Sequence, residues 1–86
     1  MTVRELIAEL QKMDGDRVAI VQKDAEGNGY SPLRGIDDNA AYVAEESWYG
    51  QVRRQSITEE DRKKGYSDED LAPPGAVPCV VLFPVN

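Results

Sequence analysis

Residues 77–83, Val-Pro-Cys-Val-Val-Leu-Phe, form the most hydrophobic run of this 86-residue chain. Five consecutive apolar residues begin at Cys79, with two adjacent valines among them. A short apolar run rich in β-branched residues favours a buried strand. Because no polar residue interrupts these five positions, we expect a central strand covered on both faces or nearly so.

The opposite end of the chain predicts a helix. Thr2 and Glu5 have the spacing of a capping box, in which each side chain accepts a hydrogen bond from the other residue's backbone N–H. Apolar residues then recur at steps of three and four, at Val3, Leu6, Ile7, Leu10 and Met13. We expect an amphipathic helix from residue 2 or 3 to residue 13, ended by Gly15 in the left-handed conformation.

Short extended segments fill the interval between these two ends. Residues 18–21 are apolar and β-branched, and residues 30–36 read as a further strand in which Pro32 argues against a central position. Residues 41–45 predict a third strand, and residues 48–53 its continuation or another hairpin. The pattern indicates an antiparallel meander.

Residues 56–76 form an acidic insertion before the last strand. Thr58 can cap one or two helical turns in which acids come first and bases last, as the helix dipole favours, with Gly65 as the stop. The whole chain, residues 1–86, is therefore expected to be a single α+β domain. Its amphipathic N-terminal helix packs on a small, mainly antiparallel sheet of four to five strands, with a short helical insertion before the last strand.

Composition excludes several classes of protein. The chain has 10 basic and 16 acidic residues, a net charge of −6, one cysteine and no histidine. These counts leave no ligand set for zinc, haem or an iron–sulfur cluster and no histidine base, so we expect no metal, no cofactor and no enzymatic activity. The negative charge disfavours duplex nucleic acid and anionic membranes. With no apolar run of about 18 residues and no signal peptide, the expected location is the cytoplasm.

One loop resembles half of a calcium site. Asp24, Glu26 and Asn28 occupy positions 1, 3 and 5 of an EF-hand loop, with Gly29 at position 6. The acid required at position 12 is absent, because Gly35 stands there. The turn-forming residues alone explain the segment, and we expect an ordinary turn.

Aromatic, hydroxyl and arginine side chains suggest a binding site. Tyr, Trp and Arg carry much of the energy at protein interfaces, and the same types stack on a nucleobase and hold its phosphate. The alternative is that Trp48 and two of the tyrosines belong to the core. Because adjacent strand residues point to opposite faces, only one of Arg53 and Arg54 is expected in any given site. The candidate ligand- or partner-binding residues are Tyr30, Ser31, Arg34, Trp48, Tyr49 and Arg53.

Acidic side chains gather in the insertion. They favour either a carboxylate surface that meets a basic protein or a solvated, solubilising loop. The candidate acidic surface comprises Glu59, Glu60, Asp61, Asp68, Glu69 and Asp70.

Three segments resemble small bacteriophage and prophage accessory proteins, a group with no established activity. They are residues 2–13 followed by a turn and a strand, Gly29 to Leu33, and Pro78 to Pro84. The resemblance implies a phage origin. Small acidic phage proteins of this kind include antagonists of host defence, some of which block a defence protein and others of which sequester a nucleotide second messenger.

These observations lead to two functional hypotheses. The first is a non-enzymatic phage protein that antagonises a host defence factor by stoichiometric binding, its acidic surface meeting a basic one. The alternative is a small-ligand binder that sequesters an anionic nucleotide at a subunit interface. Exposed edge strands in so small a sheet favour a homo-oligomer in either case.

Overall fold

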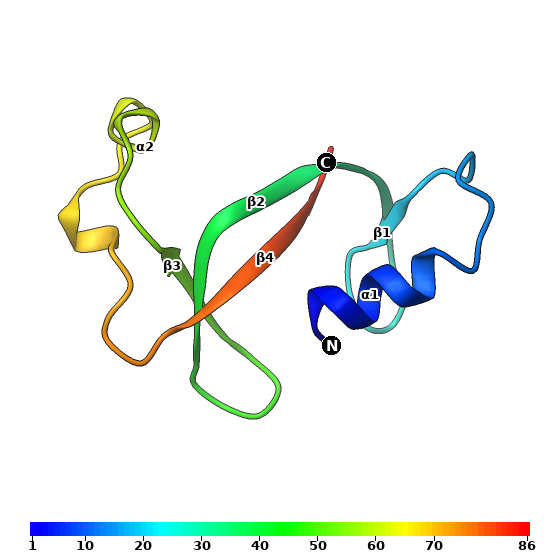
Figure 1. Cartoon of the computed structure of the whole chain (residues 1–86), viewed down its shortest axis with the longest axis horizontal. Coiled ribbons are helices and arrows are strands. Elements are labelled where there is room, and N and C mark those ends of the chain that lie inside the picture. The colour runs from blue at the N-terminus through cyan, green and yellow to red at the C-terminus, as the bar shows by residue number, and fades with distance from the viewer. The chain divides into compact units, whose positions relative to one another are not determined.

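The computed structural model describes residues 1–86 (Figure 1). The elements are α1 (Val3–Leu10), β1 (Ile20–Gln22), β2 (Tyr30–Ala44), β3 (Gly50–Arg54), α2 (Glu59–Lys63), the 3₁₀ helix η1 (Asp68–Asp70) and β4 (Val77–Pro84). The predicted α+β class, with a helix before the sheet and short helices before the last strand, is confirmed. No helix has the length and apolar character needed to cross a membrane.

The long strand β2 organises a four-stranded antiparallel sheet. It pairs with β1 in a register that sets Ile20 opposite Pro32, and with β3 in a register that sets Ala44 opposite Gly50. Strand β4 also pairs with β2, so every strand of the sheet meets the same central element. The segments predicted as separate strands, residues 30–36 and 41–45, belong to one continuous strand, β2, which ends at Ala44.

The chain divides into two compact units, which the sequence did not indicate. The first unit contains Met1–Gly35 and Leu82–Asn86, and the second contains Ile36–Val81. The first holds five basic and six acidic residues, whereas the second holds five basic and ten acidic residues. The second unit therefore carries a net charge of −5 and nearly all of the protein's negative excess.

In the first unit, the predicted capping box of α1 is confirmed. The Thr2 hydroxyl accepts from Glu5 N at 3.2 Å, and Thr2 N donates to the Glu5 carboxylate at 3.2 Å. The predicted end of the helix is wrong. The helix ends at Leu10, and Gly15 does not adopt a left-handed backbone. Residues 11–13 already form turns that satisfy the last helical carbonyls, so no left-handed glycine is needed there.

Strand β4 is less covered than its sequence predicts. None of its eight residues is fully buried, and Val77, Pro78 and Leu82 are exposed. The expectation of a strand covered on both faces is therefore wrong. Hydrophobic runs indicate a preference for burial, but a chain of this size has too few elements to cover both faces of every strand.

In the second unit, the buried core lies in β2 where it pairs with β3. Ala40 and Ala41 are the fully buried hydrophobic residues. Gly50 begins β3 so close to β2 that a Cβ there would overlap the Val43 carbonyl oxygen and the Tyr42 hydroxyl. The backbone N–H groups of Glu45 and Glu46 both donate to the Tyr49 carbonyl at 3.1 Å. Residues 45–49 are thus a loop, and the predicted strand over residues 48–53 starts only at Gly50.

Candidate functional site

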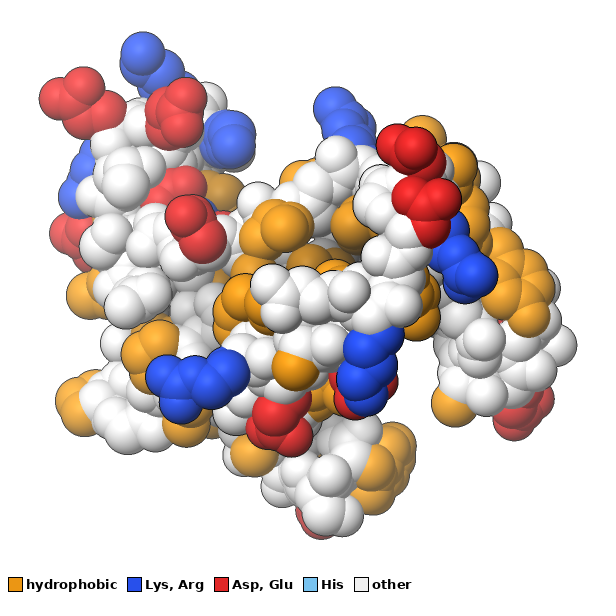
Figure 2. Space-filling model, turned by 45° about the vertical axis from the view of Figure 1, so that its right-hand side comes forward, with side chains coloured by type: hydrophobic (Ala, Val, Ile, Leu, Met, Phe, Trp, Pro, Cys, Tyr) orange, Lys and Arg blue, Asp and Glu red, His pale blue; other side chains and the backbone are white.

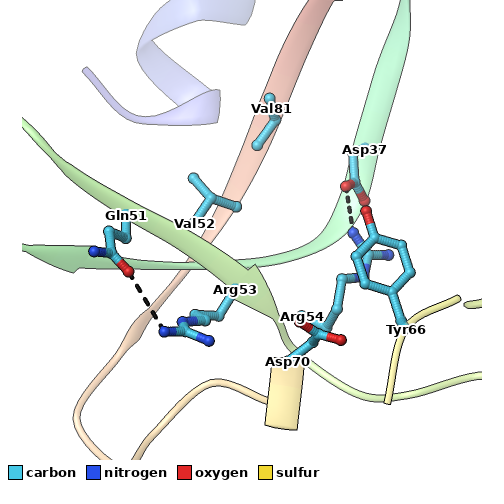
Figure 3. A pocket seen from close by; sticks show the side chains of 8 residues that line it. All are labelled: Asp37, Gln51, Val52, Arg53, Arg54, Tyr66, Asp70 and Val81. Carbon is cyan, nitrogen blue, oxygen red and sulfur yellow. Dashed lines mark hydrogen bonds and ion pairs between the residues drawn. The ribbon is translucent and has the colours of Figure 1, made fainter. Parts of the chain in front are cut away.

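Arg54 is the centre of the polar structure in the second unit. Its Nη1 contacts Asp37 Oδ2 at 2.5 Å, and its Nη2 contacts Asp61 Oδ1 at 3.2 Å. The guanidinium carbon lies 5.2 Å from the centre of the Tyr66 ring, a cation–π distance (Figure 3). The Arg54 side chain is only 12% exposed, and its Nε has no hydrogen-bond partner. This arginine, in β3, therefore links β2 to the acidic insertion, residues 56–76.

Asp61, expected on the acidic surface, is instead a buried residue with 4% exposure. Its backbone N–H donates to the Thr58 hydroxyl at 3.1 Å, and its carboxylate accepts from Thr58 N at 3.2 Å. The same carboxylate accepts from Asn39 Nδ2 at 3.2 Å. Capping thus turns Asp61 inward at the start of α2, where Arg54 neutralises it.

The network changes the proton affinity of its carboxylates. The hydrogen bond from Arg54 holds the pKa of Asp37 below its ordinary value of 3.8. Burial is the largest influence on Asp61 and raises its pKa, but the hydrogen bonds from Thr58 and Arg54 and the charge of Arg54 together lower it. The hydrogen bond to Asp37 in turn raises the pKa of Arg54. All three groups therefore stay ionised at neutral pH.

Arg53 is half-buried and forms no ion pair. Its Nη1 donates to the backbone carbonyl of Glu69 at 3.2 Å, and its Nη2 lies 3.5 Å from Gln51 Oε1. Gln51 Nε2 donates onward to Glu45 Oε1 at 2.6 Å. Neutral oxygen atoms therefore orient this guanidinium.

Two cavities open beside these arginines. The larger has a volume of about 420 Å³ and is lined by Asp37, Gln51, Val52, Arg53, Arg54, Tyr66, Asp70 and Val81 (Figure 3). The expectation that only one of Arg53 and Arg54 joins a given site is wrong, because both line this cavity. Alternation fixes where the Cβ atoms point, but Arg54 ends its strand and its long side chain can bend toward the same space.

The smaller cavity has a volume of about 290 Å³ and shares two residues with the larger one. It is lined by Val43, Glu45, Gln51, Arg53, Glu69, Leu71 and Pro73. Both cavities lie within the second unit.

The remaining acidic residues are placed as the sequence indicates, with one exception. Glu59, Glu60, Asp68 and Glu69 are exposed, whereas Asp70 is half-buried and accepts from Ser67 N at 2.8 Å. Asp68 also pairs with Arg62 at 2.8 Å. Acidic and basic side chains reach the surface at several places, interspersed with hydrophobic ones (Figure 2). The four exposed carboxylates lie on capped helical turns, which fixes their backbone positions.

The predicted binding residues are divided between the two units. Tyr30, Ser31 and Arg34 belong to the first unit, where Tyr30 and Arg34 are exposed. Ser31 is buried, and its hydroxyl donates to the Pro32 carbonyl at 3.0 Å and accepts from Asn86 N at 3.1 Å. Ser31 therefore has a structural role in fixing the last residue of the chain.

Trp48 and Tyr49 belong to the second unit together with Arg53. Trp48 is 80% exposed, and its ring centre lies 4.5 Å from that of Tyr49. The alternative that places Trp48 in the core is therefore wrong. These two exposed rings, whose planes are tilted by 54°, belong to the connection between β2 and β3.

The loop of Asp24, Glu26 and Asn28 is a turn. Asp24 Oδ1 accepts from Glu26 N at 2.9 Å and from Asn28 N at 3.1 Å, and Gly27 has a positive φ of 78°. A hydrogen bond from the Asn28 backbone is the largest influence that lowers the pKa of Asp24. No group of three or more His, Cys, Asp or Glu side chains is arranged to hold a metal ion.

Sequence reasoning missed Asp37, Asn39 and Tyr66, and it considered Arg54 only as an alternative to Arg53. One local signal indicated that Asp61 turns away from the acidic surface. Thr58 and Asp61 have the spacing of a capping box, which draws the carboxylate back toward the helix start and away from solvent. No comparable local pattern connects Asp61 to Arg54 or Asn39, because those contacts form between distant segments.

Comparison with known proteins adds no relative. No family model, curated protein or solved structure matches the chain.

Proposed function

We propose that the protein is a non-enzymatic, phage-encoded protein that antagonises a host defence factor by stoichiometric binding. Its partner is a host protein with a basic surface, bound in the host cytoplasm. The resemblance of three segments to phage accessory proteins supports the choice of a host factor. The choice of a basic partner rests on the net negative charge of the second unit.

One observation carries the proposal. The second unit has a net charge of −5, and its exposed acids Glu59, Glu60, Asp68 and Glu69 lie on short capped helices. The ion pair between Arg54 and Asp61 attaches α2 to the sheet. Acids on an ordered backbone lose less entropy on binding than those of a flexible loop, and a net negative charge attracts a basic partner at long range.

The loop between β2 and β3 supplies the apolar part of the interface. Trp48 and Tyr49 are exposed, lie in the same unit as the acids, and have their ring centres 4.5 Å apart. Large aromatic residues at interfaces contribute most when they are buried by the partner within a polar rim. We assign these two side chains as anchors.

Self-association belongs to the same proposal. Ala40 and Ala41 are the only fully buried hydrophobic residues, while Ile36, Val52 and Val77 are among the large hydrophobic residues left exposed. A second copy would cover part of this surface. Native mass spectrometry of the purified protein reports the subunit count, and a monomer at micromolar concentration would contradict self-association.

The alternative function is nucleotide sequestration. Arg53 supports it, because this half-buried guanidinium lacks an ion pair and lines both cavities. The charge of −5 in the same unit opposes it, since phosphates are repelled at long range.

Two variants separate these functions. One neutralises the exposed acids with Glu59→Gln, Glu60→Gln and Asp68→Asn, and leaves Asp61 intact because Arg54 depends on it. The other reverses charge with Arg34→Glu and Arg53→Glu. Both are checked for native circular dichroism and used to capture binding partners from host lysate.

We expect the acid-neutralised variant to lose a basic host protein that the wild type retains in fixed stoichiometry. The arginine variant should retain that protein. The opposite result, with capture lost only in the arginine variant, would refute the acidic surface and favour the nucleotide.

A further inference from the structure

The smaller cavity of the second unit combines an apolar surface with two carboxylates. Val43, Leu71 and Pro73 contribute aliphatic groups, and Glu45 and Glu69 contribute acids. Its volume of about 290 Å³ lies at the lower end of the range of ligand pockets and is sufficient for one side chain. Its shape and chemistry therefore suit an amphipathic side chain.

The carboxylates of this cavity have oxygen atoms that accept no hydrogen bond from the protein. The Glu69 carboxylate forms no hydrogen bond or ion pair, although its backbone carbonyl accepts from Arg53 at 3.2 Å. Glu45 uses only Oε1, which accepts from Gln51 at 2.6 Å. One guanidinium faces two carboxylates, so the lining has a net charge of −1.

We propose that this cavity binds a single arginine side chain of the partner. The inference rests on the proposed function, which requires a basic partner, and names the contact that anchors it. A guanidinium donates in a planar fork to carboxylates and is more weakly hydrated than an ammonium group. Its aliphatic stem covers apolar surface such as that of Val43, Leu71 and Pro73. One positive charge brings the lining to neutrality.

The position of the cavity along the chain fits this role. Glu69 lies in η1 within the acidic segment, and Glu45 begins the loop that carries Trp48 and Tyr49. An arginine bound here would contact residues of both surfaces assigned to the partner. Arginine is also enriched among the residues that dominate binding energy at interfaces.

The test is an NMR titration of the ¹⁵N-labelled full chain with N-acetyl-arginine amide. N-acetyl-citrulline amide serves as the matched control, because it has nearly the same shape without the charge. We expect the arginine probe to bind with a dissociation constant on the order of millimolar, as small fragments do. The amide signals of Val43, Glu45 and Leu71 should shift, and citrulline should shift them at least fivefold less at equal concentration.

Variants then locate the contact. Glu69→Gln and Glu45→Gln should each weaken the arginine probe at least threefold. Asp38→Asn, an exposed acid of the same unit that lines neither cavity, should leave its affinity within twofold. Equal shifts from citrulline, shifts confined to other residues, or no effect of Glu69→Gln would each overturn the proposal.

Capture of the partner distinguishes this proposal from the function on which it rests. If the double variant Glu45→Gln/Glu69→Gln retains the basic host protein as the wild type does, the anchor is wrong and the function stands. If the wild type captures no basic protein, the proposed function fails independently of the probe titration.

Discussion

Arg54 Nη2 lies 3.2 Å from Asp61 Oδ1, and this contact joins the last residue of β3 to the first turn of α2. Asn39 adds a second link, because its Nδ2 donates both to Asp61 at 3.2 Å and to the Ser56 carbonyl at 2.9 Å. The position of the exposed acids on α2 therefore depends on a contact that is itself buried.

Removing Arg54 should destabilise the protein more than removing any surface arginine. Arg54→Met leaves Asp37 and Asp61 without their counter-ion, and we expect a loss of about 2 kcal/mol, or about 10 °C in melting temperature. Arg62→Met is the matched control, because its pair with Asp68 is largely exposed and is worth about 0.5 kcal/mol or less. Thermal unfolding followed by circular dichroism measures both. Equal losses would show that Arg54 is not the link.

Stability should fall at acidic pH in a way that depends on the same network. The pKa values of Asp37 and Asp61 are lowered by folding, so their stabilisation is present above the ordinary value of 3.8 and is lost as pH falls through the lower folded values. Urea unfolding between pH 7 and pH 2 measures this dependence. Asp61→Asn should flatten the curve below about pH 4. An unchanged slope in that variant would contradict a charged, paired Asp61.

Gly50 should tolerate no side chain. In Gly50→Ala the new Cβ would overlap the Val43 carbonyl oxygen and the Tyr42 hydroxyl, and we expect a loss of about 1–3 kcal/mol with a disturbed hairpin. Gly15→Ala is the control, because its Cβ meets nothing within 4 Å and its backbone has no positive φ. Denaturant unfolding of both variants makes the comparison. Equal stability of the two would mean that β2 and β3 do not approach so closely at Gly50.

Local patterns predicted the elements better than the contacts between them. The capping box at Thr2 and the helix cap at Thr58 depend on residues three apart, and both are present in the structure. The register of β2 against its three partner strands depends on pairing between residues that are far apart in the sequence. Local patterns carry no information about such pairing, so they predicted two strands in place of β2. The apolar run at β4 indicated a strand correctly but overstated its burial, because burial depends on which elements remain to cover it.

For the same reason, only some residues of the candidate site could be predicted from the sequence. Single residue types indicated the exposed acids, Trp48 and Arg53, since charge and exposed aromatic groups are properties of individual side chains. The role of Arg54 depends on Asp37 from β2 and Asp61 from α2, and Asn39 of β2 also contacts Asp61. Short-range spacing carries no information about that convergence.

Trp48 should matter for binding and not for folding. Because it is 80% exposed, Trp48→Ala should change the free energy of unfolding by less than about 0.5 kcal/mol. The fluorescence of the chain's one tryptophan should be that of an indole in water and should shift to shorter wavelength when the partner binds. We expect affinity to fall at least tenfold in the variant. Unchanged affinity would remove Trp48 from the interface.

The central claim is that the exposed acids of the second unit bind a basic host protein. A calorimetric titration of the captured partner measures it directly, with the wild type and the Glu59→Gln/Glu60→Gln/Asp68→Asn variant compared at about 0.15 M salt. We expect a fixed stoichiometry for both, and at least tenfold weaker binding for the variant, which is about 1.4 kcal/mol. Equal affinity of the two proteins, with the variant's fold intact, would contradict the acidic surface as the binding site.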